Sequence, residues 1–181
     1  ATPDFGGFTA AASYSFGENK NLPAPNVWAA GKVAAFNVAY SGGPVFIGLA
    51  YQAEKANGSV PATKFTQINA SYDLGAAKLL GAYGNVKNGV DVSGVAAPKI
   101  KEYQLGVDVP VGGAFTLSGG FASSKSTGIA ASIKHTGFGL AGLYALSKRT
   151  NLYAGFQNAK QEQAAVTSKI TTYAAGVRHT F

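Results

Sequence analysis

The amino-acid sequence predicts an all-β protein: a transmembrane antiparallel up-and-down β-barrel, with ten strands in this chain and one barrel domain over residues 1–181. Three observations lead to this prediction. Charged residues make up 13% of the chain, about half the share found in soluble domains. Segments of about ten residues alternate between large apolar and small or polar side chains. The connections between them alternate between short turns and longer polar stretches, as in outer-membrane barrels.

The first five segments share this alternation. Residues 7–16 set Phe8, Ala10, Ala12, Tyr14 and Phe16 against Thr9, Ala11, Ser13 and Ser15. The larger sets of the next three segments are Ala34, Phe36, Val38 and Tyr40, then Val45, Ile47, Leu49 and Tyr51, then Thr66, Ile68, Ala70 and Tyr72. The fifth segment, residues 77–87, sets Leu79, Gly81 and Tyr83 against Lys78, Leu80 and Ala82. Its pattern is weaker, and a register one residue away stays open.

The other five segments continue the pattern. The sixth sets Tyr103, Leu105, Val107 and Val109 against Glu102, Gln104, Gly106 and Asp108. The larger sets of the next three are Phe115, Leu117 and Phe121, then Phe138, Leu140, Tyr144 and Leu146, then Leu152, Ala154 and Phe156. The last sets Tyr173, Ala175, Val177, His179 and Phe181 against Thr172, Ala174, Gly176 and Arg178. Helical spacing is not sustained in any segment, so the chain is predicted to be all-β.

The connections fall into two groups. The short turns are residues 41–43, 73–75, 110–113 and 147–150. The longer polar stretches are residues 17–27, 54–63, 88–98, 125–128 and 158–168. An even number of strands then places both ends of the chain on the short-turn side.

Composition excludes several classes of function. The chain has no Cys, and its two histidines, His135 and His179, offer little for a metal site or a general base. We therefore expect no enzyme activity, no catalytic residues, no metal and no cofactor. The net charge is +7, but the basic residues are scattered singly along the sequence, which does not favour a nucleic-acid groove. No run approaches the ~18 apolar residues of a membrane-spanning helix.

The choice of core face separates a membrane barrel from a soluble barrel or sandwich. If the large residues pointed inward, the exterior would carry too few charges for a soluble protein. If they face lipid, the small and polar set lines a water-filled lumen, and the predicted pore-lining residues are Arg178, Lys78, Glu102, Asp108, Gln104, Gln67 and Asn69. The predicted interface aromatics are Tyr14, Tyr40, Tyr51, Tyr72 and Tyr144.

Several strings resemble the general porins of Gram-negative bacteria, in particular their neisserial and β-proteobacterial branch. They are residues 3–8 (PDFGGF), 13–18 (SYSFGE), 144–150 (YALSKRT), 152–154 (LYA) and 176–181 (GVRHTF). The resemblance covers the whole chain, which corresponds to about the C-terminal half of such a porin. It implies the last ten strands of a sixteen-stranded barrel, with the other strands elsewhere. The alternative is that ten strands close on themselves.

The resemblance also implies a location and partners. The family lies in the Gram-negative outer membrane as multi-pass homotrimers, in contact with outer-membrane lipids and lipopolysaccharide. The C-terminal pattern of Phe181, Val177 and Tyr173 resembles the signal read by the outer-membrane assembly machinery.

The function expected on this basis is passive diffusion of small hydrophilic solutes and ions through a water-filled channel. Arg178 and Lys78 would favour anions, whereas Glu102 and Asp108 would oppose that preference. The alternative function is a non-conducting barrel that presents its loops for adhesion or structural anchoring.

Overall fold

The computed structural model describes residues 1–17, 31–55, 61–90, 96–128 and 132–180. These residues form ten strands: β1 (Phe8–Ser15), β2 (Lys32–Gly42), β3 (Val45–Lys55), β4 (Thr63–Asp73), β5 (Lys78–Val90), β6 (Ala96–Pro110), β7 (Phe115–Thr127), β8 (Ile133–Ala145), β9 (Thr150–Gln163) and β10 (Val166–His179). The all-β prediction is confirmed, with the predicted number of strands. Among the described residues, no helix is long and apolar enough to cross a membrane.

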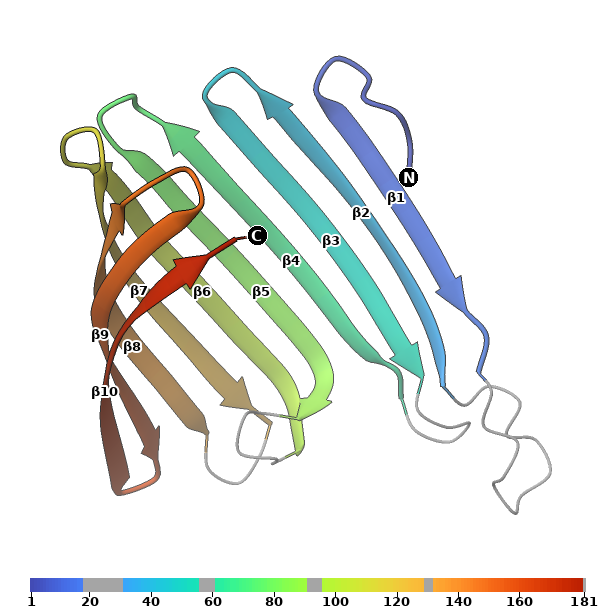
Figure 1. Ribbon diagram of the computed structural model, residues 1–181. Coiled ribbons are helices and arrows are strands. Elements are labelled where there is room, and N and C mark those ends of the chain that lie inside the picture. Colours follow the sequence, from blue (N-terminus) through green and yellow to red (C-terminus); the bar gives the residue numbers. More distant parts are fainter. Residues whose placement is uncertain (18–30, 56–60, 91–95, 129–131, 181) are drawn as a thin grey trace.

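The strands form one antiparallel sheet in which each strand pairs with its neighbours in the sequence, from β1 to β10. Figure 1 shows this sheet curving strongly on the side of β7 to β10, while β1 to β4 form its flatter part. β1 and β10 are its two edges and are not paired with each other among the described residues. The sheet is therefore a curved wall, and it does not close into the narrow ten-stranded barrel of the alternative prediction.

The register places the alternating residues on the two faces as the sequence predicts. Cross-strand partners share a face, because successive side chains point to opposite sides of a sheet. Leu79 of β5 lies opposite Tyr72 of β4 and Val107 of β6, which are both in the larger set. The register of residues 77–87 is therefore the one predicted.

All four of the predicted short connections lie at one end of the sheet, at the top of Figure 1. Three of them contain a glycine in the left-handed region: Gly43 (φ 53°), Gly75 (φ 80°) and Gly112 (φ 72°). In the turn between β4 and β5, the Gly75 amide donates to the Asp73 carboxylate at 2.7 Å. Glycine removes the steric penalty of a positive φ, so these positions stop one strand and start the next.

The predicted long connection over residues 158–168 is wrong. β9 runs to Gln163 and β10 starts at Val166, so only two residues separate these strands. Ala164 takes φ 51° at this tight turn. The polar residues of this segment continue the ladder beyond the apolar part of the strands, with Lys169 opposite Lys160. The polar residues therefore mark where the apolar outer surface of the sheet ends, whereas the two strands remain paired beyond that point.

The other predicted long stretches are shorter than expected or fall largely outside the described residues. β7 continues to Thr127, so residues 125–128 are mostly strand. The predicted stretches 17–27, 54–63 and 88–98 overlap residues 18–30, 56–60 and 91–95, which lie outside the described part of the chain.

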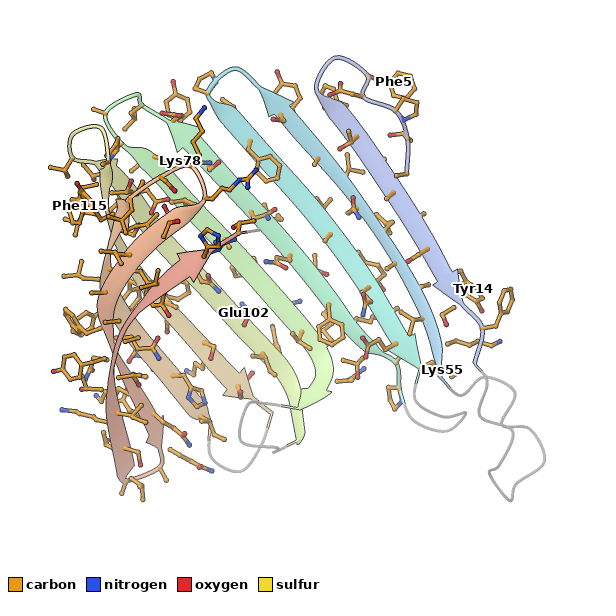
Figure 2. The ribbon with its side chains drawn as sticks, viewed as in Figure 1. Phe5, Tyr14, Lys55, Lys78, Glu102 and Phe115 are labelled. Carbon is orange, nitrogen blue, oxygen red and sulfur yellow. The ribbon has the colours of Figure 1, made fainter. Side chains whose placement is uncertain are left out.

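The large apolar side chains lie on the outward face of the sheet and do not form a buried core. Among the described residues, Ile100 and Ile133 are the only buried hydrophobic residues, whereas Leu105 is 64% exposed and Val177 is 64% exposed. Figure 2 shows side chains standing out from the sheet across its whole width. A sheet with its larger apolar residues exposed needs an apolar surrounding, which a lipid bilayer supplies.

Candidate pore wall

The opposite, inward face carries mainly small and polar residues in continuous rows across the sheet, with a few larger apolar residues such as Phe46 and Leu80 between them. One row runs from Ala11 through Asn37, Ala50, Gln67, Gly84, Glu102, Ser124, His135 and Gln161 to Ser168. A second runs from Thr9 through Ala39, Gly48, Asn69, Ala82, Gln104, Ala122, Gly137 and Ala159 to Ile170. This face matches the predicted lumen face.

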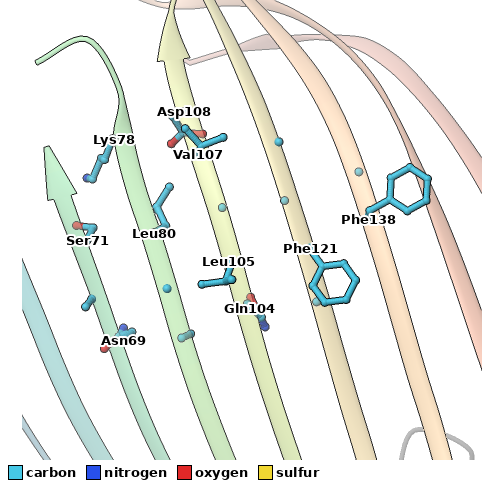
Figure 3. Close-up of a pocket in the computed structure, with 18 of the residues that line it drawn as sticks. Asn69, Ser71, Lys78, Leu80, Gln104, Leu105, Val107, Asp108, Phe121 and Phe138 are labelled. Carbon is cyan, nitrogen blue, oxygen red and sulfur yellow. The ribbon is translucent and has the colours of Figure 1, made fainter. Parts of the chain in front are cut away.

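Three hollows lie along this face, with volumes of about 890, 480 and 390 Å³. The largest spans β2 to β9, and Figure 3 shows Asn69 and Ser71 on β4, Lys78 on β5, and Gln104 and Asp108 on β6. Small residues leave this space open, among them Ala82, Gly106, Gly120, Ala122, Gly137 and Gly139. Side chains of this size leave the hollow unfilled, so the face can border water.

The structure brings most of the predicted pore-lining residues together. Five of them line the largest hollow: Gln67, Asn69, Lys78, Gln104 and Asp108. Glu102 lines the second hollow with His135 and Gln161. Arg178 shares the inward face but lies opposite Asn151 near the short-turn end, and it lines none of these three hollows.

Two of these polar side chains lie flat across glycines of the neighbouring strand. A Cβ added at Gly84 would meet the Glu102 side chain, with Cγ at 2.6 Å and Cδ at 2.9 Å. A Cβ added at Gly48 would likewise meet the Asn69 amide. Glycine on one strand therefore makes room for a longer polar group from the next, which keeps that group against the wall.

Charges on the inward face are mixed. Lys78 lies opposite Asp73 on one side and Asp108 on the other, so its charge is flanked by two carboxylates. Asp108 also accepts a hydrogen bond from the Ser118 hydroxyl at 2.6 Å. In the described strands, the inward residues that carry a formal charge at pH 7 are Glu54, Asp73, Glu102 and Asp108, with Lys78 and Arg178 as the cations.

Three inward residues were missed by the sequence reading. Glu54 and Asp73 fall in the predicted connections, but both belong to strands in the structure. Glu54 lies two residues from Gln52 and shares its inward face, and Asp73 lies two residues from Ser71 and shares its inward face. His135 lines the second hollow and lies opposite Ser124. Extending the alternation of each strand by one more pair of residues would have found all three. No group of potential ligands among the described residues could hold a metal ion.

The predicted interface aromatics lie on the outward face at both ends of the strands. Tyr40, Tyr72 and Tyr144 are close to the short turns, and the Tyr40 ring contacts Phe8 with centroids 4.7 Å apart. Tyr14 and Tyr51 lie toward the opposite end. Figure 2 shows Tyr14 and Lys55 at that end, away from Phe5 and Phe115.

The predicted assembly residues lie partly within the described chain. Tyr173 and Val177 point outward from β10, 78% and 64% exposed, and the Tyr173 ring contacts Phe156. Phe181 lies outside the described residues. Nothing in the geometry tests the signal itself, which stays a prediction.

A curved antiparallel meander with an apolar outer face and a small, polar inner face is the wall of a transmembrane β-barrel of the outer-membrane class. The chain belongs to the Gram-negative porin family, whose model matches residues 1–178. This membership confirms the resemblance seen in the sequence and places the chain in the outer membrane.

Individual relatives agree with the family. Outer membrane porin protein 32 of Delftia acidovorans is 31% identical over 98% of this chain and 50% of its own length. An outer membrane porin protein of Bordetella pertussis is also 31% identical, over 99% of this chain and 56% of its own length. The structure of an anion-selective porin from Comamonas acidovorans matches 99% of this chain and 57% of its own, with a TM-score of 0.78 and 30% identity. The chain thus spans about half the length of these relatives.

Proposed function

We propose that this chain forms part of the wall of a water-filled outer-membrane channel through which small hydrophilic solutes and ions diffuse passively. The observation that carries the proposal is the inward face, where mainly polar and small residues of eight successive strands, β2 to β9, border an open hollow of about 890 Å³. The side chains of this face are too small to fill the space beside it, so water occupies that space. Solutes can pass through such a water-filled space without any catalytic group. The porin relatives support the same function.

The proposal also covers the complete barrel and its assembly, beyond the strands of this chain. Because the chain spans about half of its relatives, further strands complete the barrel wall between β1 and β10. The assembled protein is a homotrimer in the outer membrane, in contact with its lipids, and we propose no enzyme activity for it.

The proposed channel carries a preference for anions on the strength of the anion-selective relative. Lys78 and Arg178 are the inward cations of the described strands, and four carboxylates share that face with them. An anion preference therefore depends on cations outside the described strands. This part of the proposal is separable from conduction itself.

Single-channel recording in planar bilayers tests conduction. The folded protein, with its flanking strands, is expected to give stepwise current increments. A folded protein that gives no current would contradict the proposal and would favour a non-conducting barrel that presents its loops. A reversal potential under a salt gradient then reports the ion preference.

The substitution Glu102→Gln tests whether the inward face borders the ion path. It removes a carboxylate from the second hollow, so the reversal potential is expected to shift toward anions. Glu162→Gln is the matched control, because Glu162 lies on the outward face, opposite Lys134. Equal shifts in both variants would contradict the assignment of the two faces.

A further inference from the structure

Uncharged amide side chains are prominent on the inward face. All six glutamines of the chain point to this side of the sheet: Gln52, Gln67, Gln104, Gln157, Gln161 and Gln163. Alternation accounts for polar residues on a face that borders water, but it does not select an amide over a charged group. An amide carries hydrogen-bond donors and an acceptor together, without a charge. The inward face therefore offers both kinds of hydrogen bond to a neutral solute.

Three of the inward amides lie close together beside the largest hollow. We call them the amide cluster: Gln67 and Asn69 of β4 and Gln104 of β6. All three are exposed. The Gln52 amide donates to the Glu54 carboxylate, whereas no side chain of the amide cluster has a hydrogen-bond partner among the described residues. Their donors and acceptors are therefore open to a solute.

The register fixes the spacing of the amide cluster. Asn69 lies opposite Ala82 of β5, which in turn lies opposite Gln104. Strands are about 4.8 Å apart, so the Cα atoms of Asn69 and Gln104 are about 10 Å apart, with one methyl group between the side chains. Gln67 is about 7 Å from Asn69 along β4. Figure 3 shows Asn69 and Gln104 on their two strands. The cluster frames a shallow seat over Ala82.

Apolar side chains border this seat on the side of the turn between β4 and β5. A Cβ added at Gly48 would meet Phe46 Cζ and Asn69 Cγ, each at 3.4 Å, so the ring and the amide lie next to each other above this glycine. Leu80 lies across Gly106, whose added Cβ would meet Leu80 Cδ1 at 3.7 Å. Phe46 and Leu80 both line the hollow. The seat therefore combines amides with an adjoining apolar surface.

Formal charges lie at the two ends of the seat. Lys78 is two residues beyond Leu80 toward the turn, and it is flanked by Asp73 and Asp108. Glu102 is two residues from Gln104 in the other direction. The carboxylates outnumber the lysine, so the seat lacks the excess positive charge that would hold an anion. No group of side chains in the described residues could hold a metal ion. A neutral solute suits this environment best.

We propose that this seat is a binding subsite for neutral polyhydroxylated solutes, in particular for a sugar ring on its way through the channel. The apolar C–H face of the ring packs against Phe46 and Leu80, and the hydroxyl groups exchange hydrogen bonds with the amide cluster. These bonds replace bonds to water, so the expected Kd is about 1 mM or weaker. The proposal rests on the proposed channel function and adds a preferred class of solute.

Current through the complete folded protein, with its flanking strands, tests the proposal in planar bilayers. The probe is maltotriose, a neutral trisaccharide, which should reduce the mean current in a saturable way as its concentration rises. Polyethylene glycol of the same hydrodynamic radius has no hydroxyl groups along its chain, so its effect should not saturate. Equal, saturable reductions by both solutes would mean that size alone matters and would overturn the subsite.

The double substitution Asn69→Leu/Gln104→Leu removes two amides and keeps side chains of similar size. We expect the apparent Kd for maltotriose to rise about tenfold. Asn37→Leu/Gln161→Leu is the matched control, because these inward amides line the third and second hollows and not the largest. It should change the Kd by less than about twofold. Equal loss in both double variants, or no loss in the first, would contradict the assigned seat.

A single variant covers the case in which the double variant does not fold. Folding is judged by heat-modifiable mobility on a gel. Gln104→Leu then replaces the double variant, because Gln104 is exposed and its substitution leaves the strand contacts in place. The Kd for maltotriose should rise about threefold. An unchanged Kd in this folded variant would overturn the role of Gln104 in the seat.

Saturation-transfer NMR separates this proposal from the channel function. Maltotriose mixed with the detergent-solubilised protein should receive saturation from it, and Asn69→Leu/Gln104→Leu should weaken the signal. This readout needs no current. An ion current that maltotriose does not reduce, together with no saturation transfer, would overturn the subsite and leave the channel standing. Saturation transfer that depends on the two amides, in a barrel that carries no current, would support the subsite and contradict conduction.

Discussion

Glycines on the inward face decide where longer polar side chains lie. Gly84 and Gly48 leave space for Glu102 and Asn69 to lie along the wall. A side chain at either position would push its neighbour toward the lumen. At the scale of single residues, the shape of the proposed pore thus depends on the glycines of the wall as well as on the side chains that line it.

Gly84→Ala is expected to move Glu102 away from the wall. The added Cβ would overlap Glu102 Cγ, which is flexible enough to shift, so the barrel should fold. With the carboxylate displaced into the lumen, the reversal potential should shift toward cations. Gly81→Ala is the control, because its Cβ would face outward and meet Leu105 Cδ2 at an ordinary 3.8 Å. A shift in the control, or none in Gly84→Ala, would contradict this account.

Leu105→Arg tests the outward face directly. Leu105 is 64% exposed on β6, two residues from Tyr103 and on the short-turn side of it. A charge at this depth in the lipid should lower the free energy of unfolding by about 2–4 kcal/mol, measured by urea unfolding in lipid vesicles. Gln104→Arg places the same charge on the adjacent inward residue and should cost far less. A similar loss in both would mean that the faces are assigned wrongly.

At the scale of the element, strands continue beyond the apolar part of the sheet. β9 and β10 keep pairing through Lys160 and Lys169 as far as Gln163 and Val166. The two-residue connection then requires a backbone that most residues avoid. Ala164 has φ 51°, where glycine is the common choice at the first position of such a turn.

Ala164→Gly should stabilise the hairpin of β9 and β10. Removal of Cβ relieves the strain of a positive φ, so the free energy of unfolding should rise by up to about 1 kcal/mol in a urea titration. Ala165→Gly is the control, because Ala165 has no positive φ and glycine there adds only flexibility. Stabilisation by both substitutions, or by neither, would contradict the role assigned to Ala164.

At the scale of the whole molecule, β1 and β10 are open edges. Backbone groups along an edge that faces lipid have no water to bind, and each unsatisfied group costs several kcal/mol. The 181 residues by themselves should therefore associate through these edges when refolded in detergent. Light scattering coupled to size exclusion would detect mixed oligomers. A uniform monomer that conducts ions would instead show that ten strands can close alone.

The sequence by itself determined the strands, their two faces and their order. Neighbouring residues such as Tyr103 and Gln104 differ strongly in polarity, and this alternation repeats in ten segments. Only one assignment of residues to the two faces of the sheet is compatible with it. Neighbouring strands in a meander then pair because short turns such as residues 73–75 allow nothing else. The turn at Ala164 escaped prediction, since its residues carry no turn signal.

The tertiary structure alone decided which distant residues meet. Lys101, Lys125 and Lys134 are far apart along the chain and directly opposed across β6, β7 and β8. Lys78 likewise lies opposite Asp73 and Asp108 through the register. Alternation sets the face of a side chain, but its neighbours depend on where each strand starts relative to the next. That offset is set by turn geometry and packing between strands, so the charge pattern of both faces emerges only in the folded sheet.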